Sequence, residues 1–96
     1  MNKEYWVARV NIDENDAFQE YATKAKSAIE KFGGKYVVRG GEFSILEGEH
    51  NFERNVIVEF ESVSKARECY NSKDYQEAKF FRDGKANFNA IVIEGY

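Results

Sequence analysis

The sequence predicts an α+β fold in which strands and helices follow the order βαββαβ. Three observations support this fold class. Four short runs rich in aromatic and β-branched residues have strand length, two intervening segments carry apolar residues at helical spacing, and glycine pairs or polar clusters separate these runs. The 96 residues suffice for one modest hydrophobic core, so we expect a single domain over residues 1–96.

The first predicted strand covers residues 5–12, where the even-numbered positions are all apolar, as expected for a period of two. The polar positions 13–16 suit the start of a helix. From residue 17 to residue 32, apolar residues recur every three or four positions and form one helical face. Gly33 and Gly34 follow directly, which predicts the end of this first helix.

The middle of the chain is predicted to hold two further strands. Residues 35–39 form the second strand, and residues 42–46 form a short extended arm that could pair at a sheet edge or with another subunit. Residues 47–54 are a polar loop, and residues 55–60 form the third strand.

The second helical segment is predicted to be broken. Ser62 or Ser64 can cap its first piece, whose buried side includes Val63. The dipeptide at residues 71–72 interrupts the helix, and Ser72 can cap a second piece that ends before Gly84. The fourth strand is expected at residues 88–94.

This order of elements predicts a ferredoxin-like, four-stranded antiparallel sheet with the helices on one face. Alternation assigns the strand residues to the two faces. The face predicted to contact the helices carries Trp6, Ala8, Val10, Ile12, Tyr36, Val38, Val56, Val58, Phe60, Ile91 and Ile93. The opposite face carries Tyr5, Val7, Arg9, Val37, Arg39, Ile57, Glu59, Ala90, Val92 and Glu94. This second face is too apolar for water and too charged for a dry core, so we expect a homodimer through this sheet face.

Composition excludes several other partners. Fourteen basic and seventeen acidic residues give a net charge of −3, so no nucleic acid is expected to bind. No signal-like apolar segment opens the chain, and every apolar run is too short to cross a membrane. The single cysteine, Cys69, cannot form an intrachain disulfide and favours a reducing compartment, so we expect a cytoplasmic protein.

Six segments, in order, resemble domain-of-unknown-function family 1330. They are YWVARV (5–10), GGKYVVRGG (33–41), LEG (46–48), VEF (58–60), YNS (70–72) with Tyr75, and IEG (93–95). The resemblance covers nearly the whole chain and implies the dimeric α/β barrel version of the ferredoxin-like fold, in which two sheets face each other. It implies no chemistry, because the family is named for lacking an assigned one.

Arg39 and Glu59 are the candidate catalytic residues, because alternation places both on the second sheet face. The guanidinium could hold a carboxylate or enolate while Glu59 moves a proton, provided that burial raises the pKa of this carboxyl. The alternative is a structural ion pair between two sheets.

Five residues are candidates for ligand binding. Tyr70, Tyr75 and Arg82 lie on the broken second helix, where two phenols and a guanidinium could rim a cleft against the sheet. Tyr5 and Arg9 are the further candidates, on the second sheet face. The alternative for the tyrosines is packing in the core with the hydroxyl at its rim.

The remaining chemistry-bearing residues predict no further site. His50, the single histidine, is expected to be a solvated loop residue, since a metal site there would lack a second imidazole or thiol. We therefore expect no metal and no cofactor, and Cys69 is a poor nucleophile candidate.

Two classes of function remain. One is a cofactor-independent isomerase- or monooxygenase-like enzyme acting on a small organic molecule, and the other is a non-catalytic dimeric module that binds a small molecule or a protein.

Overall fold

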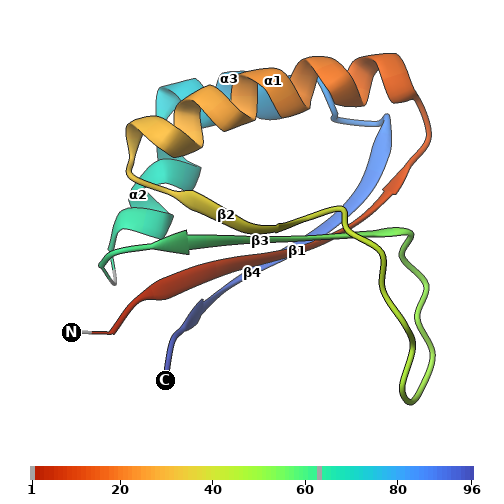
Figure 1. Ribbon diagram of the computed structural model, residues 1–96. Helices are drawn as coiled ribbons and strands as arrows, with labels where there is room; N and C mark the ends of the chain where they lie inside the picture. The colour runs from red at the N-terminus through yellow and green to blue at the C-terminus, as the bar shows by residue number, and fades with distance from the viewer. Residues whose placement is uncertain (1, 63) are drawn as a thin grey trace.

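The computed structural model describes residues 2–62 and 64–96 and has the predicted α+β architecture (Figure 1). The elements are β1 (Glu4–Ile12), α1 (Asn15–Lys31), β2 (Lys35–Arg39), β3 (Arg54–Phe60), α2 (Lys65–Asn71), α3 (Lys73–Phe80) and β4 (Ala86–Glu94). The strands form one sheet in the order β2-β3-β1-β4, and every neighbouring pair is antiparallel. The four-stranded antiparallel sheet predicted from the sequence is therefore confirmed.

The molecule has two layers. The helices cover one face of the sheet, and the other face is uncovered (Figure 1). The Cα extents of 34 × 33 × 17 Å fit one helical layer on one sheet. The segment between β2 and β3 projects from the sheet on the side away from the helices (Figure 1). Residues 42–46, which were predicted to be extended, belong to this segment and form no strand.

The helix boundaries follow their local sequence signals only in part. Helix α1 begins at Asn15, two residues before the apolar pattern, and Glu14 occupies its N-cap without a side-chain hydrogen bond. Ser64 is at the N-cap of α2 and likewise makes no side-chain cap hydrogen bond. Val63, predicted to be buried, lies outside the described residues.

The break between α2 and α3 is built as predicted. The Ser72 hydroxyl accepts a hydrogen bond from the Tyr75 backbone N–H at 3.2 Å and donates one to the Cys69 carbonyl at 2.6 Å. One side chain thus satisfies a free donor at the start of α3 and a free acceptor at the end of α2. The resulting bend sets the position of α3 and of the turn that follows it.

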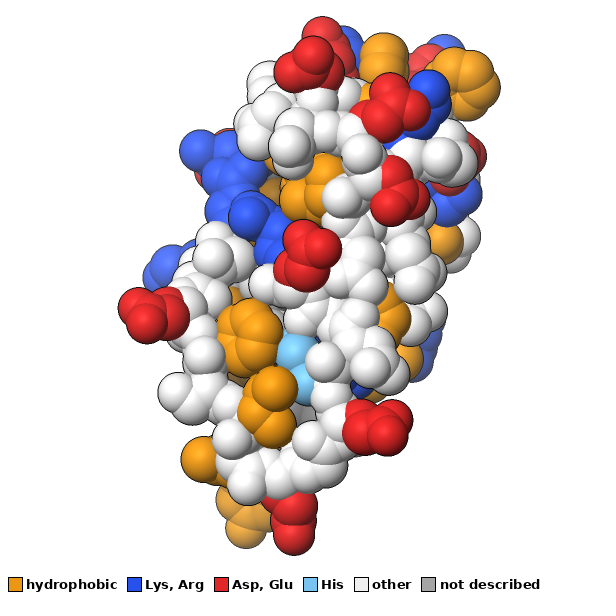
Figure 2. Space-filling model, turned by 90° about the vertical axis from the view of Figure 1, so that its right-hand side faces the viewer, with side chains coloured by type: hydrophobic (Ala, Val, Ile, Leu, Met, Phe, Trp, Pro, Cys, Tyr) orange, Lys and Arg blue, Asp and Glu red, His pale blue; other side chains and the backbone are white. Residues whose placement is uncertain are grey.

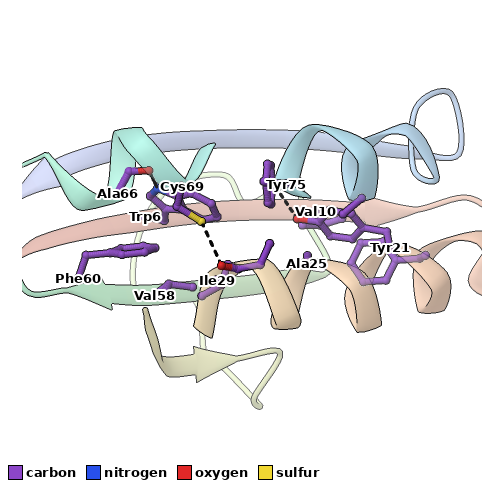
Figure 3. Close-up of a cluster of buried hydrophobic side chains, with 13 residues drawn as sticks. Trp6, Val10, Tyr21, Ala25, Ile29, Val58, Phe60, Ala66, Cys69 and Tyr75 are labelled. Atoms are coloured by element: carbon purple, nitrogen blue, oxygen red, sulfur yellow. Dashed lines mark hydrogen bonds between the residues drawn. The ribbon is translucent and has the colours of Figure 1, made fainter. Parts of the chain in front are cut away.

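The core lies between the sheet and the three helices (Figure 3). Trp6 of β1 is at its centre, 5.2 Å from the Phe60 ring and 5.0 Å from the Tyr75 ring, measured between centroids. Its indole N–H donates to the Ala66 carbonyl at 3.0 Å, so the buried polar atom is paired. The even-numbered positions of β1 and β3 face this core, as alternation predicted.

The prediction for the faces of β4 was wrong. Trp6 pairs with Val92 and Ala8 pairs with Ala90, so these two β4 residues face the helices. Ile91 and Ile93 lie on the uncovered face and are 58% and 51% exposed. Residues 90–93 are apolar at every position, so the sequence period could not fix which face each side chain takes.

A β-bulge in β2 overturned a second assignment. Tyr36 pairs with Val58, but Val38 then pairs with Ile57, so Val37 is the extra residue. An extra residue shifts every later side chain to the opposite face. Val38 therefore lies on the uncovered face instead of the helical face, and Arg39 lies on the helical face instead of the uncovered one. Strand β2 lies at one edge of the sheet.

Candidate functional site

A cleft lies between the broken helix and the edge strand β4. It encloses about 610 Å³, within the range of roughly 300–1,000 Å³ that is typical of small-molecule sites. Its lining residues are Trp6, Ala8, Tyr70, Tyr75, Lys79, Arg82, Phe88, Asn89, Ala90, Ile91 and Val92. The cleft thus contains the three residues of the broken helix that the sequence indicated for ligand binding.

Helical spacing brings the polar residues of the cleft together. Tyr75 and Lys79 are four residues apart on α3, and Arg82 follows three residues later, in the turn after the helix. Side chains at these intervals lie on one side of a helix. Tyr70, from α2, joins them because the break at Ser72 turns α3 back against it, and the Tyr70 and Tyr75 ring centroids are 5.3 Å apart.

Arg82 is the unusual residue of this cleft. Its side chain is only 6% exposed, and its carbon Cζ lies 3.7 Å from the Phe88 ring centroid, a close cation–π contact. Its Nε atom is buried and has no hydrogen-bond partner. Among the described residues no carboxylate forms an ion pair with it. A buried guanidinium without a counter-charge is costly, so this arrangement favours an anionic ligand.

Two tyrosine hydroxyls accompany the guanidinium. The Tyr21 and Tyr75 oxygens are 2.6 Å apart, and both rings are buried. A dashed line in Figure 3 marks this hydrogen bond. Burial by itself lowers the pKa of Arg82, but its interactions with Tyr75 and Tyr21 outweigh that effect and raise the pKa above its ordinary value. Burial raises the pKa of Tyr21 well above its ordinary value, so this phenol is protonated at neutral pH.

The hydroxyl pair leaves one proton to donate. A hydrogen bond between two phenols uses only one of the two hydroxyl hydrogens, and a guanidinium has no acceptor atom to receive the other. When Tyr21 is the donor of this bond, the Tyr75 hydroxyl hydrogen is left to donate to a ligand oxygen in the cleft. We call Tyr21, Tyr75 and Arg82 the tyrosine–arginine cluster. Two of its members, Tyr75 and Arg82, line the cleft, and O–H and N–H donors are the groups that stabilise a carboxylate, phenolate or enolate.

The charge of the cleft agrees with this chemistry. The whole chain is acidic, with a net charge of −3, yet the lining includes Lys79 and Arg82 and no acidic residue. The walls are aromatic, with Trp6, Tyr70 and Phe88 beside the polar end. An apolar ring with an anionic oxygen fits such a site, because the ring contacts the aromatic walls while the oxygen meets the cations.

The structure does not bring the two candidate catalytic residues together. Arg39 is exposed on the helical face, with its Cζ 4.6 Å from the Tyr36 ring centroid. Glu59 lies on the uncovered face, where it pairs with Lys3 at 2.9 Å and accepts a hydrogen bond from Tyr5 at 3.3 Å. The hydrogen bond from Lys3 lowers the pKa of Glu59 below its ordinary value, against a smaller opposing effect of burial. A proton acceptor with a raised pKa is therefore not present at Glu59.

The two remaining ligand-binding candidates do not line the cleft and lie on the uncovered face. Tyr5 contacts Glu59, as described, and Arg9 donates from Nη2 to Nδ1 of His50 at 3.0 Å. His50 is half-buried and its ring centroid is 4.7 Å from that of Phe43, so the expectation of a solvated loop histidine was wrong. In Figure 2 the histidine, drawn in pale blue, lies beside hydrophobic side chains drawn in orange.

Two further residues with reactive side chains, Cys69 and Glu4, are buried. Cys69 is fully buried, and burial raises the pKa of its thiol to about 12, so it is held in the unreactive form. Glu4 is 1% exposed, with Oε2 3.5 Å from Arg67 and with Oε1 lacking a hydrogen-bond partner.

Within residues 2–62 and 64–96, no cluster of three or more metal-ligating side chains occurs. No helix in these same ranges is long and apolar enough to cross a membrane.

Sequence reasoning placed Trp6, which lines the cleft, and Tyr21, which is hydrogen-bonded to the lining residue Tyr75, only in the core, and it overlooked Lys79. The apolar spacing of the sequence predicts that Trp6 and Tyr21 are buried. It does not predict whether a buried side chain also adjoins a cleft. Lys79 was not considered, although its spacing of four from Tyr75 and three from Arg82 was a usable signal.

The fold is that of a ferredoxin-like α+β domain, with a cleft between its broken second helix and its last strand. Residues 3–96 match the family described as domain of unknown function (DUF1330). The chain belongs to this family. A comparison with curated protein sequences found no match.

Solved structures support the same fold. A protein of unknown function from Rhodopseudomonas palustris is 21% identical with a TM-score of 0.78, covering 99% of this chain and 83% of its own. A dimeric ferredoxin-like protein of unknown function from Thermobifida fusca is 10% identical with a TM-score of 0.57, covering 96% and 90%. A putative antibiotic biosynthesis monooxygenase from Nitrosomonas europaea is 17% identical with a TM-score of 0.55, covering 99% and 98%. At these identities the likeness is one of fold.

Proposed function

We propose that this protein binds a small, planar organic anion in the cleft between α2, α3 and β4. The observation that carries the proposal is the buried guanidinium of Arg82, which has no carboxylate partner and an unpaired Nε within the described contacts. A carboxylate or phenolate oxygen of the ligand, bound at the guanidinium, supplies the missing counter-charge. The aromatic walls hold the ring of the ligand.

The lining residues favour binding of an anion over proton abstraction. None of them is a histidine or a carboxylic acid, the side chains that most often act as a general base near neutral pH. A ligand that is already ionised at neutral pH needs no such base. The best-supported function is therefore the binding of a preformed organic anion.

A cofactor-independent enzyme of the isomerase or monooxygenase kind is the second candidate. One observation favours it, namely the proton that the Tyr21–Tyr75 pair can donate beside Arg82. Donors fixed in a buried site stabilise an enolate more than the ketone from which it forms. The Nitrosomonas protein of similar fold, titled a putative monooxygenase, agrees with this candidate by analogy.

Fluorescence of Trp6 provides a test. Trp6 is the single tryptophan and lines the cleft, so its emission reports directly on a bound ligand. Benzoate is expected to change the emission and to saturate at millimolar concentration. The neutral amide of the same shape, benzamide, is expected to bind much more weakly, because it brings no charge to Arg82.

Two arginine variants serve as a matched pair. Arg82→Met removes the charge but keeps the apolar volume, and it should abolish the preference for benzoate over benzamide. Arg39→Met removes an exposed arginine that does not line this cleft and should bind benzoate like the unchanged protein. Equal binding of benzoate and benzamide to the unchanged protein would refute the proposal.

We also propose that two chains associate through the uncovered sheet face. On this face the register aligns Val38, Ile57, Val7 and Ile91 in one aliphatic row across all four strands. A continuous apolar row of this kind is normally covered by protein. The Thermobifida protein of similar fold is described as dimeric, which supports the proposal by analogy. A cytoplasmic location remains our proposal, favoured by the single, unpaired Cys69.

A further inference from the structure

The mouth of the cleft carries a second cation, which the binding of a single anionic oxygen does not use. Lys79 lines the cleft and lies three residues before Arg82. Its side chain is 28% exposed, whereas Arg82 is almost entirely buried. The cleft therefore has a buried cation at its inner end and a more accessible one nearer its opening.

The existing partner of Lys79 holds it only weakly. Lys79 Nζ is 3.3 Å from Asp83 Oδ1, and the Asp83 side chain is 53% exposed, so solvent screens the attraction. The order is also the less favourable one, since a helical pair with the lysine before the acid opposes the helix dipole. Asp83 itself follows the C-terminal end of α3, where a negative charge is disfavoured. A ligand anion can therefore replace Asp83 at small cost.

The lining contains no acidic residue to neutralise the two cations. Two cations at different depths fit one molecule with two acidic groups better than two separate anions. A lysine side chain is long and flexible, so it can follow the second group over a range of positions.

We propose that the natural ligand carries two acidic groups on an apolar frame, with the inner group bound by Arg82 and the outer group bound by Lys79. This inference rests on the proposed function, because it requires Arg82 to bind the first group. Lys79 is then the residue that distinguishes a dianion from a monoanion. Asp83 competes with the ligand for Lys79 and so sets the strength of that preference.

The test compares three probes by Trp6 fluorescence. Isophthalate has two carboxylates, its monoamide has the same shape with one charge, and benzoate has one charge only. The unchanged protein is expected to bind isophthalate about fivefold more tightly than the monoamide, the factor that one partly exposed ion pair provides. Lys79→Met should remove this difference and leave benzoate binding unchanged.

Two further variants complete the test. Asp83→Asn releases Lys79 and should increase the preference for isophthalate over its monoamide. Lys85→Met is the control, because it removes a lysine that pairs with Glu14 and does not line the cleft, and this preference should then stay unchanged. The Lys79 side chain is partly exposed and that of Asp83 is exposed, so folding should survive each change. Equal binding of isophthalate and its monoamide, or an equal effect of Lys79→Met on both, would overturn the inference while benzoate binding still supports the function. Failure of benzoate to bind would instead refute the proposed function.

Discussion

At the residue scale, Glu59 illustrates how one close partner determines the ionisation of a carboxyl group. The hydrogen bond from Lys3 lowers the pKa of Glu59 below its ordinary value of 4.5. A carboxyl group whose pKa is lower in the folded state than in the unfolded state stabilises the folded state at any pH above the unfolded-state pKa. This contribution is lost as the pH falls through the folded-state pKa. Glu59 therefore stabilises the fold at neutral pH and ceases to do so in acid.

This sign leads to a prediction for Glu59→Gln. The variant should be less stable than the unchanged protein at neutral pH, and the difference should shrink as the pH falls from 4.5 through the lowered pKa of Glu59, as measured by urea unfolding across the range. Glu61→Gln, from an exposed residue beyond β3, provides the control and should have little effect. A difference that grows in acid would show that the interaction with Lys3 is not the dominant one.

Arg39 shows why the candidate catalytic pair could not be located from the sequence. Alternation places it with Glu59 only if β2 is regular, and the bulge at Val37 reverses its direction. Nothing in the run of residues 35–39 distinguishes a bulged strand from a regular one. The contact of the Arg39 guanidinium with the Tyr36 ring is therefore a consequence of pairing with β3, which a single strand does not reveal.

At the scale of elements, the junction of α2 and α3 depends on Ser72. Loss of an N-cap side chain costs about 1 kcal/mol, and Ser72 also bonds the last turn of α2. Ser72→Ala is therefore expected to reduce the free energy of unfolding by about 1 kcal/mol or slightly more in urea denaturation. Ser64→Ala changes an N-cap that makes no side-chain hydrogen bond and should cost clearly less. Equal losses for the two variants would contradict this account of the junction.

The end of β2 gives a second prediction at this scale. Gly40 has φ of 70°, and an added Cβ there would meet the Arg54 guanidinium, whereas Gly41 has open space around it. Gly40→Ala should reduce stability by about 1 kcal/mol, because alanine disfavours a positive φ. Gly41→Ala should change it much less, by the same thermal or urea measurement. A neutral effect at Gly40 would indicate that β2 continues differently from its described path.

The elements differ in how clearly the sequence defined them. The alternation in β1 fits only one assignment of its buried face, and so does the three- and four-residue spacing in α1. The bounds and buried faces of both elements were predicted closely. The β4 run has apolar residues on both faces, so its direction was settled only by pairing Trp6 with Val92. The cleft was predicted in outline from Tyr70, Tyr75 and Arg82, because helical spacing does report which side chains share a side.

At the scale of the whole molecule, the uncovered face determines the expected assembly. Val7 is central in its aliphatic row, between Ile57 and Ile91. Light scattering at micromolar concentration should give twice the chain mass of 11.1 kDa. Val7→Asp would bury an unpaired charge between the sheets and should shift the protein toward the monomer, whereas Lys26→Asp, on the exposed side of α1, should leave it dimeric. A monomeric unchanged protein would refute this assembly.

The overall architecture was predictable because many weak local signals agree on one topology, whereas the chemistry of the cleft was not. Burial of Arg82 and the absence of a described carboxylate beside it are properties of the packed chain. They depend on how Phe88 of β4 and Tyr21 of α1 meet around the guanidinium. Elements this distant in sequence are brought together only by the complete fold.

The side-chain N–H of Arg82 offers the most direct measurement of the central claim. Its buried Nε has no hydrogen-bond partner in the described contacts, so a ligand oxygen that binds there must change its surroundings. In a proton–nitrogen correlation spectrum, the Arg82 Nε–H signal is identified by its loss in Arg82→Met. We expect benzoate to shift this signal to a saturating position at millimolar concentration while benzamide leaves it in place. An Arg82 signal that does not move with benzoate, while Trp6 emission or other signals do, would show that the anion binds elsewhere and would contradict the proposed site.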